Sequence, residues 1–210
     1  MKSIILIGAG ALTRDLVEAF GASAFAAIYV DPAYAAAGIG GLPLVTSWEA
    51  ARRLGGHYML GVSDIAHRAR AAAAAEAAGL AAAPAMVTRT AIVAADATLA
   101  PGTAIGHMAM VGPSARLAGN TLVMHGAVVG HDVELGANTV LCAGASLGGH
   151  VRLGGDSFIG SNAVLAPGLV FGQHSYVAAG AACFRNGEAH SRWIGNPARR
   201  VALAAPTLTS

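Results

Sequence analysis

The chain has 210 residues, of which 55% are hydrophobic and only 11% are charged, and its formal net charge is +2. About a quarter of the residues in an ordinary soluble domain are charged. This composition excludes an intrinsically disordered chain, a coiled coil and a polybasic nucleic-acid binder, and the length allows one large domain or two small ones.

The low charge raises the question of a membrane-spanning segment. The longest stretch without Asp, Glu, Lys or Arg covers residues 157–184, enough for a helix across a bilayer of about 30 Å. Asn162, Pro167 and Gln173 interrupt it, which does not fit a continuous apolar helix. The apolar run after Lys2 is too short for a signal peptide. We therefore expect a cytoplasmic protein without membrane insertion.

Cys142 and Cys183 are the only cysteines. They are too few and too far apart for a disulfide framework or a zinc site, which fits a reducing compartment. A net charge of +2 gives no strong field that would attract nucleic acid. We expect no nucleic-acid partner.

Residues 1–86 alternate between strand and helix patterns. We predict strands over residues 3–7, 27–30 and 58–62, and helices over residues 12–20, 47–54 and 65–78. Gly79 ends the last helix and Pro84 opens the link to the next part of the chain. This alternation predicts a small α/β domain of Rossmann type, with a parallel sheet.

A glycine turn, Gly8 to Gly10, lies between the first predicted strand and helix, and Asp31 ends the second strand. Backbone N–H groups at a helix N-terminus bind phosphate, and an acid in this place often binds ribose. A full dinucleotide fingerprint needs a third glycine where Thr13 stands. The pattern favours a mononucleotide or nucleotide-sugar site; an NAD site and a purely structural turn are the alternatives.

Residues 91–186 divide into sixteen consecutive six-residue repeats without an insertion. The third position is Val, Ile or Leu in fourteen of them, and the fourth is Gly or Ala in thirteen. This period is typical of a β-solenoid. We predict that the large residue points into a three-sided prism and that the small residue after it permits the tight corner. Three repeats then close one eighteen-residue coil.

The predicted coil fixes which residues are neighbours. Residues eighteen apart lie one strand spacing apart, about 4.8 Å, and residues six apart lie on adjacent faces of the prism. So short a solenoid exposes flat, weakly charged faces. We therefore expect the chain to form a homotrimer.

The histidines of the repeats fall at the corners of the prism. His131 is followed by Asp132, and Gly149 is stacked on it in the next coil. A glycine leaves room for a ligand, and a nearby carboxylate can orient an imidazole and raise its basicity. His131 is therefore a candidate general base, with a solvated histidine as the alternative interpretation. A backbone N–H at a glycine-rich corner, such as that of Gly149, is a candidate donor to an oxyanion.

The sequence resembles the hexapeptide-repeat sugar acetyltransferases, in particular the sialic acid O-acetyltransferases and the nucleotide-amino-sugar N-acetyltransferases. Besides the repeats, the resemblance rests on residues 4–10, 29–31, 130–136, 144–149 and 195–199. It implies a Rossmann-like substrate-binding domain over residues 1–86, a left-handed parallel β-helix over residues 87–186 and a closing segment over residues 187–210.

The resemblance also implies roles for single residues. In this family the histidine that matches His131 deprotonates the sugar amine or hydroxyl, and the acid that matches Asp132 raises its basicity. The nucleophile then attacks the thioester of acetyl-CoA directly, with acetyl-CoA as a co-substrate and with no tightly bound cofactor and no metal. Besides Gly149, the acetyl-CoA contacts match Val140, Ser161 and Ala179. The nucleotide-sugar contacts match Gly10, Ala11, Leu12, Asp31, Pro32 and Ser63.

We therefore predict acetyl transfer from acetyl-CoA to the amine of a nucleotide-linked amino sugar. One alternative is O-acetylation of a sugar or a sialic acid. A second is a zinc β-helix enzyme resembling the carbonic anhydrases, with His107, His125 and His131 as ligands, and a third is a non-catalytic solenoid. The sequence leaves open the sugar, its nucleotide carrier and the length of the acyl chain.

Overall fold

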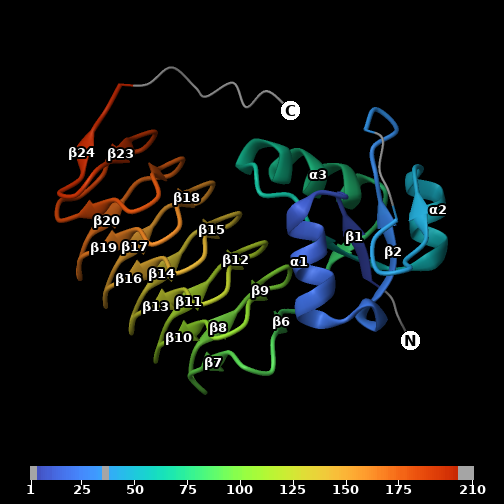
Figure 1. Ribbon diagram of the computed structural model, residues 1–210, viewed down its shortest axis with the longest axis horizontal. Coiled ribbons are helices and arrows are strands. Elements are labelled where there is room, and N and C mark those ends of the chain that lie inside the picture. Colours follow the sequence, from blue (N-terminus) through green and yellow to red (C-terminus); the bar gives the residue numbers. More distant parts are fainter. Residues whose placement is uncertain (1–3, 35–37, 203–210) are drawn as a thin grey trace.

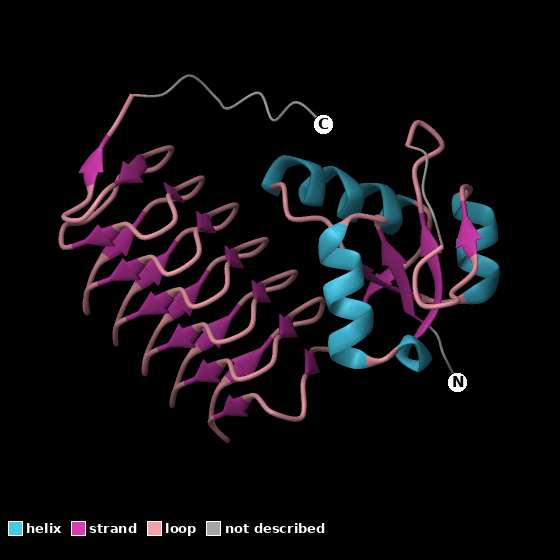
Figure 2. Cartoon of the chain, viewed as in Figure 1, coloured by secondary structure: helices cyan, strands magenta, loops and turns pink. Residues whose placement is uncertain are grey.

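The computed structural model describes residues 4–34 and 38–202 and shows an N-terminal α/β domain beside a stack of short strands (Figure 1). Within this part of the chain, helices occur in the N-terminal domain and the stack consists of strands and turns (Figure 2). None of the described helices has the length and apolar character needed to cross a membrane. Residue 3, where the first strand is expected to begin, lies outside the described residues, as do residues 203–210 of the closing segment.

The N-terminal domain is built on a five-stranded parallel sheet with the order β3-β2-β1-β4-β5. Its strands are β1 (Ile4–Ile7), β2 (Phe25–Tyr29), β3 (Leu44–Val45), β4 (His57–Leu60) and β5 (Ala81–Ala82). Its helices are α1 (Ala11–Phe20), α2 (Trp48–Leu54) and α3 (Ile65–Ala77), with a short 3-10 turn, η1 (Ala22–Ala24). The predicted Rossmann-like arrangement is confirmed, and β3 and β5 are additional edge strands.

Thr13 explains why the glycine turn lacks a third glycine. Its side chain is fully buried, and its hydroxyl hydrogen bonds to the Gly8 carbonyl at 2.7 Å and the Gly61 carbonyl at 3.1 Å. A hydroxyl has a single proton to donate and serves two carbonyls that end neighbouring strands, β1 and β4. The residue therefore fixes the turn to the sheet.

The stack is a β-helix whose strands, two residues long except for the three-residue β23, form three sheets. We name them the docking, apolar and charged sheets. The docking sheet contains β6 (Met86–Val87), β9 (Ala104–Ile105), β12 (Leu122–Val123), β15 (Val140–Leu141), β18 (Phe158–Ile159), β21 (Tyr176–Val177), β23 (Arg192–Ile194) and β24 (Arg199–Arg200). The apolar sheet contains β7 (Ile92–Val93), β10 (Met110–Val111), β13 (Val128–Val129), β16 (Ser146–Leu147), β19 (Val164–Leu165) and β22 (Ala182–Cys183). The charged sheet contains β8 (Thr98–Leu99), β11 (Arg116–Leu117), β14 (Glu134–Leu135), β17 (Arg152–Leu153) and β20 (Val170–Phe171).

The register confirms the eighteen-residue coil. Val111 pairs with Val129 in the apolar sheet, and Leu135 pairs with Leu153 in the charged sheet. Each predicted repeat supplies one strand at its second and third positions. The third residue points inward: Ile105, for example, is fully buried in the core of the prism. β6 extends the β-helix before the first predicted repeat, because it pairs with β9.

The small residue at the fourth position does not have the predicted function. The left-handed backbone that turns the corner occurs at the sixth position, as at Asp132 with φ 56° and His150 with φ 61°. The fourth position is small because the next coil lies against it. A β-carbon on Gly130 would be 2.7 Å from the Gly149 nitrogen, and one on Gly112 would be 2.8 Å from the His131 nitrogen. The prediction that this residue permits the corner was therefore wrong.

The two parts of the chain share a buried interface. Leu12 and Leu16 of α1 belong to one buried cluster with Leu122 and Val140 of the docking sheet. This packing places the N-terminal end of α1, and the glycine turn before it, next to the β-helix. The position of the substrate-binding candidates relative to the coils is therefore fixed by hydrophobic contact.

Arg68 on α3 adds a polar connection to this interface. It is fully buried and donates hydrogen bonds to the Asn138 side-chain oxygen at 3.0 Å, the Val62 carbonyl at 2.9 Å and the Asn120 carbonyl. Burial lowers the pKa of Arg68 to about 10. Asn138 in turn donates to Asp156 at 2.8 Å. The guanidinium thus joins α3 to two successive corners of the β-helix.

Candidate active site

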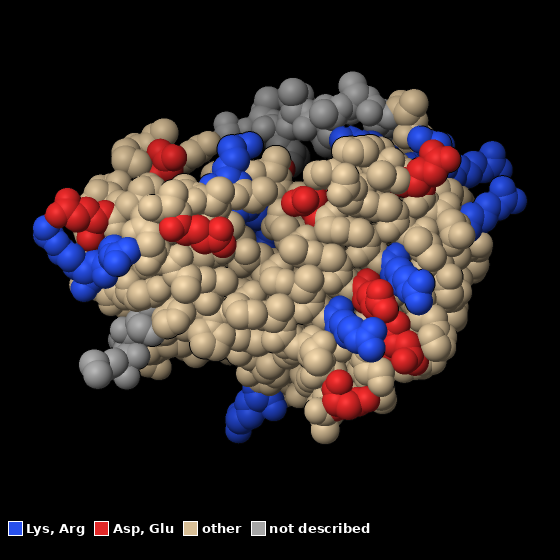
Figure 3. Space-filling model, turned by 180° about the vertical axis from the view of Figure 1, so that it is seen from behind, with Lys and Arg blue, Asp and Glu red and all other residues tan. Residues whose placement is uncertain are grey.

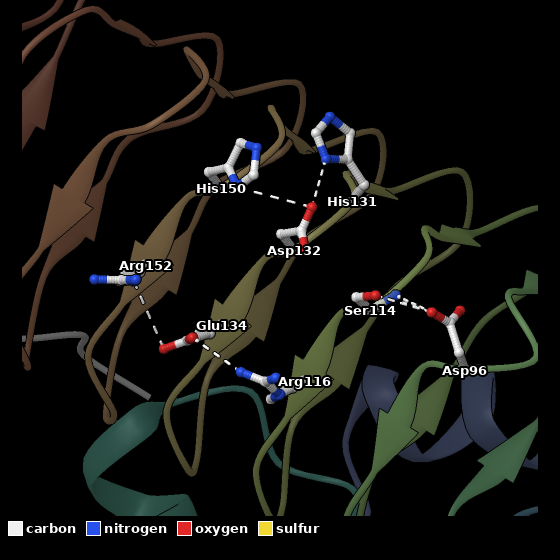
Figure 4. Close-up of polar contacts among 8 residues, drawn as sticks. All are labelled: Asp96, Ser114, Arg116, His131, Asp132, Glu134, His150 and Arg152. Carbon is white, nitrogen blue, oxygen red and sulfur yellow. Dashed lines mark hydrogen bonds and ion pairs between the residues drawn. The ribbon is translucent and has the colours of Figure 1, made fainter.

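The site is built at the corner that follows the apolar sheet, where His131 and Asp132 form the turn after β13. The distance from His131 Nδ1 to Asp132 Oδ2 is 2.8 Å (Figure 4). An ionised carboxylate only accepts hydrogen bonds, so Nδ1 carries the proton and Nε2 has the free lone pair. The dyad therefore presents an imidazole nitrogen that can accept a proton.

Gly149 lies beneath the ring of His131, one coil further on. A β-carbon at this position would be 2.4 Å from His131 Nε2 and 2.6 Å from Cε1, so glycine alone leaves the ring where it is. The Gly149 carbonyl accepts a hydrogen bond from the Gly168 N–H at 2.8 Å. The Gly149 N–H has no hydrogen-bond partner among residues 4–34 and 38–202. A free backbone donor therefore lies beside the candidate base.

His150 is a third member of the site. Its Nδ1 atom is 3.8 Å from the same Asp132 oxygen, and its ring meets the His131 ring edge to face with 4.8 Å between centroids. The hydrogen bond from His131 lowers the pKa of Asp132 below its usual value, with smaller contributions from the charges of His150 and Arg116. Asp132 is therefore ionised at neutral pH.

The N-terminal domain contains a cavity of about 600 Å³. Five of the six predicted substrate-binding residues line it, namely Gly10, Ala11, Leu12, Asp31 and Ser63. Pro32 is exposed in the loop after Asp31 and does not line the cavity. Gly10 is the N-cap of α1 and has no side chain to bond the first N–H groups of the helix, which leaves them available to an anionic group. His67 and Arg70 of α3 also line the cavity.

Two of the predicted acetyl-CoA contacts lie at another corner of the prism. Ser161 and Ala179 are in the turns after β18 and β21 of the docking sheet. The Gly180 N–H donates to the Ser161 carbonyl at 2.8 Å, which stacks these turns. His131 lies at the corner that follows the apolar sheet. Within a single chain, Ser161 and Ala179 are therefore at a different corner from His131. Gly149 is the predicted contact that lies beside the dyad.

The resemblance implies that Val140 contacts acetyl-CoA, but the structure leaves its side chain no exposed surface. Its side chain, on β15, is fully buried in the interface with the N-terminal domain. A side-chain contact with acetyl-CoA at this position would require the interface to open. The burial therefore rules out a side-chain contact of Val140 in this arrangement, and a contact through its backbone stays a prediction.

The zinc alternative needs His131 beside His107 and His125, but His131 lies at a different corner of the prism from the other two. His107 and His125 lie in the turns after β9 and β12, at the corner of Ser161, and His107 Nδ1 is 2.7 Å from the Thr90 hydroxyl. Within the part of the chain that the structure describes, the group of three possible metal ligands is instead His131, Asp132 and His150.

The charged sheet carries a ladder beside the site. Arg116 Nη1 is 3.3 Å from Glu134 Oε1, and Arg152 Nε is 3.8 Å from Glu134 Oε2 (Figure 4). These side chains are exposed, so the pairs contribute little to stability. The ladder places the positive charge of Arg116 near Asp132, where it helps to lower the pKa of that carboxyl group.

No protein-family model and no curated protein sequence matches the chain, whereas solved structures match almost its whole length. The acetyltransferase domain of PglB from Neisseria gonorrhoeae has a TM-score of 0.86 and 23% identity, over 96% of this chain and 100% of that chain. PerB from Caulobacter crescentus, solved with CoA and GDP-perosamine, has a TM-score of 0.86 and 24% identity, over 95% and 97% of the two chains. WeeI from Acinetobacter baumannii has a TM-score of 0.76 and 17% identity, over 95% and 99%.

These likenesses show the fold. The chain has the architecture of these acetyltransferase structures, an N-terminal α/β domain followed by a left-handed β-helix of hexapeptide repeats. The solenoid predicted from the repeat pattern and the left-handed β-helix implied by the resemblance are confirmed.

Proposed function

We propose that this protein transfers an acetyl group from acetyl-CoA to the amine of a nucleotide-linked amino sugar. The observation that carries the proposal is the dyad: Asp132 holds His131 at 2.8 Å, and His131 Nε2 lies over Gly149. The fold is shared with the PglB acetyltransferase domain, which has been solved with acetyl coenzyme A, and with PerB, solved with CoA and GDP-perosamine.

The proposed reaction proceeds in two steps. The sugar nitrogen attacks the thioester carbonyl carbon, a C–N bond forms, and the nitrogen loses a proton to His131 Nε2. The charge of Asp132 stabilises the resulting imidazolium, and the Gly149 N–H donates to the tetrahedral oxyanion. The oxyanion then collapses, the C–S bond breaks, and His131 returns the proton to the sulfur of the departing CoA thiol.

The N-terminal domain supplies the proposed substrate site. The N-terminus of α1 at Gly10 suits a diphosphate, because its first N–H groups face the cavity of about 600 Å³. Asp31 lies at the end of β2, where a carboxylate suits the hydroxyl groups of a ribose. Residues 1–86 would thus hold the nucleotide sugar, and residues 87–186 would carry the acetyl-transfer site.

We propose a homotrimer, because the acetyl-CoA contacts of one chain are incomplete. The apolar sheet exposes Ile92 by 67%, Met110 by 42% and Val164 by 41%, which favours burial against another subunit. Figure 3 shows charged side chains in small separate groups on a largely uncharged surface. Packing of two subunits would place the Ser161 corner of one beside the His131 corner of the other. A cytoplasmic location is part of the proposal, supported by the proposed use of acetyl-CoA and by the two free cysteines.

A free-thiol assay with acetyl-CoA tests the proposal. The acceptors are nucleotide-linked 4-amino sugars, free amino sugars and sialic acids. We expect thiol release with a nucleotide-linked amino sugar and an amide product by mass spectrometry. An ester product with sialic acid would show that the protein is an O-acetyltransferase and would overturn the proposed N-acetylation. Binding of acetyl-CoA without thiol release for any acceptor would contradict it.

A further inference from the structure

The dyad and His150 place three metal-ligand atoms at one corner of the β-helix. One ligand atom from each of His131, Asp132 and His150 lies within 4.8 Å of the other two, and the Nδ1 atoms of both histidines face Asp132 Oδ2 (Figure 4). We propose that these three residues form a binding site for a divalent transition-metal ion such as Zn²⁺, and that metal binding there stops acetyl transfer. The inhibition rests on the proposed function, whereas the metal site stands on the geometry alone.

The distances are close to those that a metal requires. Zinc bonds to imidazole nitrogen and carboxylate oxygen are about 2.1 Å, so tetrahedral ligand atoms lie about 3.4 Å apart. The Asp132 oxygen is 2.8 Å from His131 Nδ1 and 3.8 Å from His150 Nδ1. To reach that spacing, the two distances to Asp132 must change by about half an ångström, and the two histidine ligand atoms, at most 4.8 Å apart, must approach by up to about 1.4 Å. The movement is available, because the side chains of His131 and His150 are 58% and 66% exposed.

The backbone holds the ligands together in the absence of an ion. Asp132 and His150 occupy the sixth position of repeats one coil apart, and both have a left-handed backbone. The His150 N–H donates to the His131 carbonyl at 2.9 Å. The register of the β-helix thus stacks His150 on Asp132, and rigid placement of ligands reduces the entropic cost of binding.

The chemical type of the three ligand atoms favours transition-metal ions over Mg²⁺ and Ca²⁺. Two imidazole nitrogens and one carboxylate oxygen suit Zn²⁺, Cu²⁺ or Ni²⁺, whereas Mg²⁺ and Ca²⁺ prefer oxygen ligands. Arg116 is the cation next to Asp132, and Glu134 pairs with it at 3.3 Å. Arg152 shares the same carboxylate at 3.8 Å, so Glu134 offsets part of the positive charge that opposes a metal ion.

Metal binding and proton abstraction require different states of His131. In the dyad, Nδ1 carries the proton and Nε2 is free. A metal bound to Nδ1 moves that proton to Nε2, so the number of protons on the ring is unchanged. The nitrogen that should take the proton from the amine then already carries one. Metal occupancy therefore removes the base without any covalent change.

His150→Asn is the variant that tests the site. Asparagine tolerates a left-handed backbone and already occupies the sixth position of other repeats, as at Asn138 and Asn162. The matched control is His174→Asn. His174 is also at a sixth position and stacks on His190 at 4.6 Å. That pair of imidazoles is not part of a three-ligand group among the described residues.

The measurement is calorimetric titration of Zn²⁺ into the full chain after treatment with a chelator, supported by the visible spectrum of bound Co²⁺. We expect one site per chain, an affinity roughly tenfold or more weaker in His150→Asn, and no change in His174→Asn. Equal affinity in the wild type and His150→Asn, an equal loss in His174→Asn, or no binding at all would each overturn the site.

The rate of thiol release separates inhibition from binding. We expect Zn²⁺ to suppress the wild-type rate at concentrations that fill the site, and a chelator to restore it. The Zn²⁺ concentration for half-inhibition should rise roughly tenfold or more in His150→Asn, each variant being compared with its own metal-free rate. Full occupancy without inhibition would overturn the regulatory part. Zinc binding by a chain that releases no thiol with any acceptor would contradict the proposed function and leave the metal site intact.

Discussion

His131 Nε2 lies directly above the backbone of Gly149, where a β-carbon would be only 2.4 Å away. The candidate base therefore lies beside the free N–H group of Gly149 in the next coil. Even the methyl group of an alanine at position 149 would collide with the imidazole ring.

Gly149→Ala should displace the His131 ring and reduce the rate of acetyl transfer by about 100-fold, because a misplacement of about 1 Å has that effect. The measurement is kcat for thiol release, with circular dichroism to show an intact fold. Gly119→Ala is the control: residue 119 is also at the fifth position of a repeat, and its β-carbon would meet the Pro101 carbonyl at 3.2 Å, far from the dyad. A Gly149→Ala protein with wild-type kcat would contradict this geometry.

Asp132→Asn should lower kcat roughly tenfold or more, because an amide does not stabilise the imidazolium that forms on His131. Hydrogen bonding from His131 lowers the pKa of Asp132, so the wild-type carboxylate stays ionised from about pH 5 upward. The deficit should therefore be present at pH 8, where the wild-type carboxylate is ionised. An Asp132→Asn protein with wild-type kcat at pH 8 would contradict the assignment.

Arg68→Met should reduce the free energy of unfolding by about 3 kcal/mol or more, because it leaves the carbonyls of Val62 and Asn120 and the Asn138 side chain without their charged donor. Denaturant unfolding measures the effect. Arg70→Met is the control, since Arg70 is exposed on the same helix. An Arg68→Met protein as stable as this control would show that the buried hydrogen bonds do not hold the two parts together.

Val164→Glu should dissociate the proposed trimer, because it places a charge on the apolar sheet. The control is Val170→Glu on the charged sheet, where the valine has a similar exposure, 46% against 41%. Light scattering after size exclusion gives the mass of each variant. The proposal expects a monomer for Val164→Glu and a trimer for Val170→Glu. A trimer in both would move the subunit interface away from the apolar sheet.

The β-helix could be predicted from the sequence because one residue in six points to the interior and the register follows from that period. The same arithmetic stacks His150 on Asp132, although it does not give the shared carboxylate oxygen. The edge strands β3 and β5 have two residues each, too few to show a pattern. Arg68 lies in an alanine-rich helix, and its burial depends on Asn120 and Asn138, more than fifty residues away in the chain. Long-range packing of this kind leaves no local signal.

The burial of Val140 could not be predicted from the sequence either. Its place in the repeat predicts an outward side chain, and only the docking of α1 on that sheet covers it. Ser161 and Ala179 show the limit of a single chain, since their corner lies apart from the dyad in one chain and only the proposed trimer would bring the two together.

His131→Asn tests the central claim most directly. With acetyl-CoA and the best nucleotide-linked amino sugar, we expect thiol release to fall by about 10² to 10⁴-fold, while binding of acetyl-CoA and the mass of the assembly stay unchanged. Thiol release at the wild-type rate in this variant would contradict the account, because the proton of the amine would then leave by a route that does not involve His131.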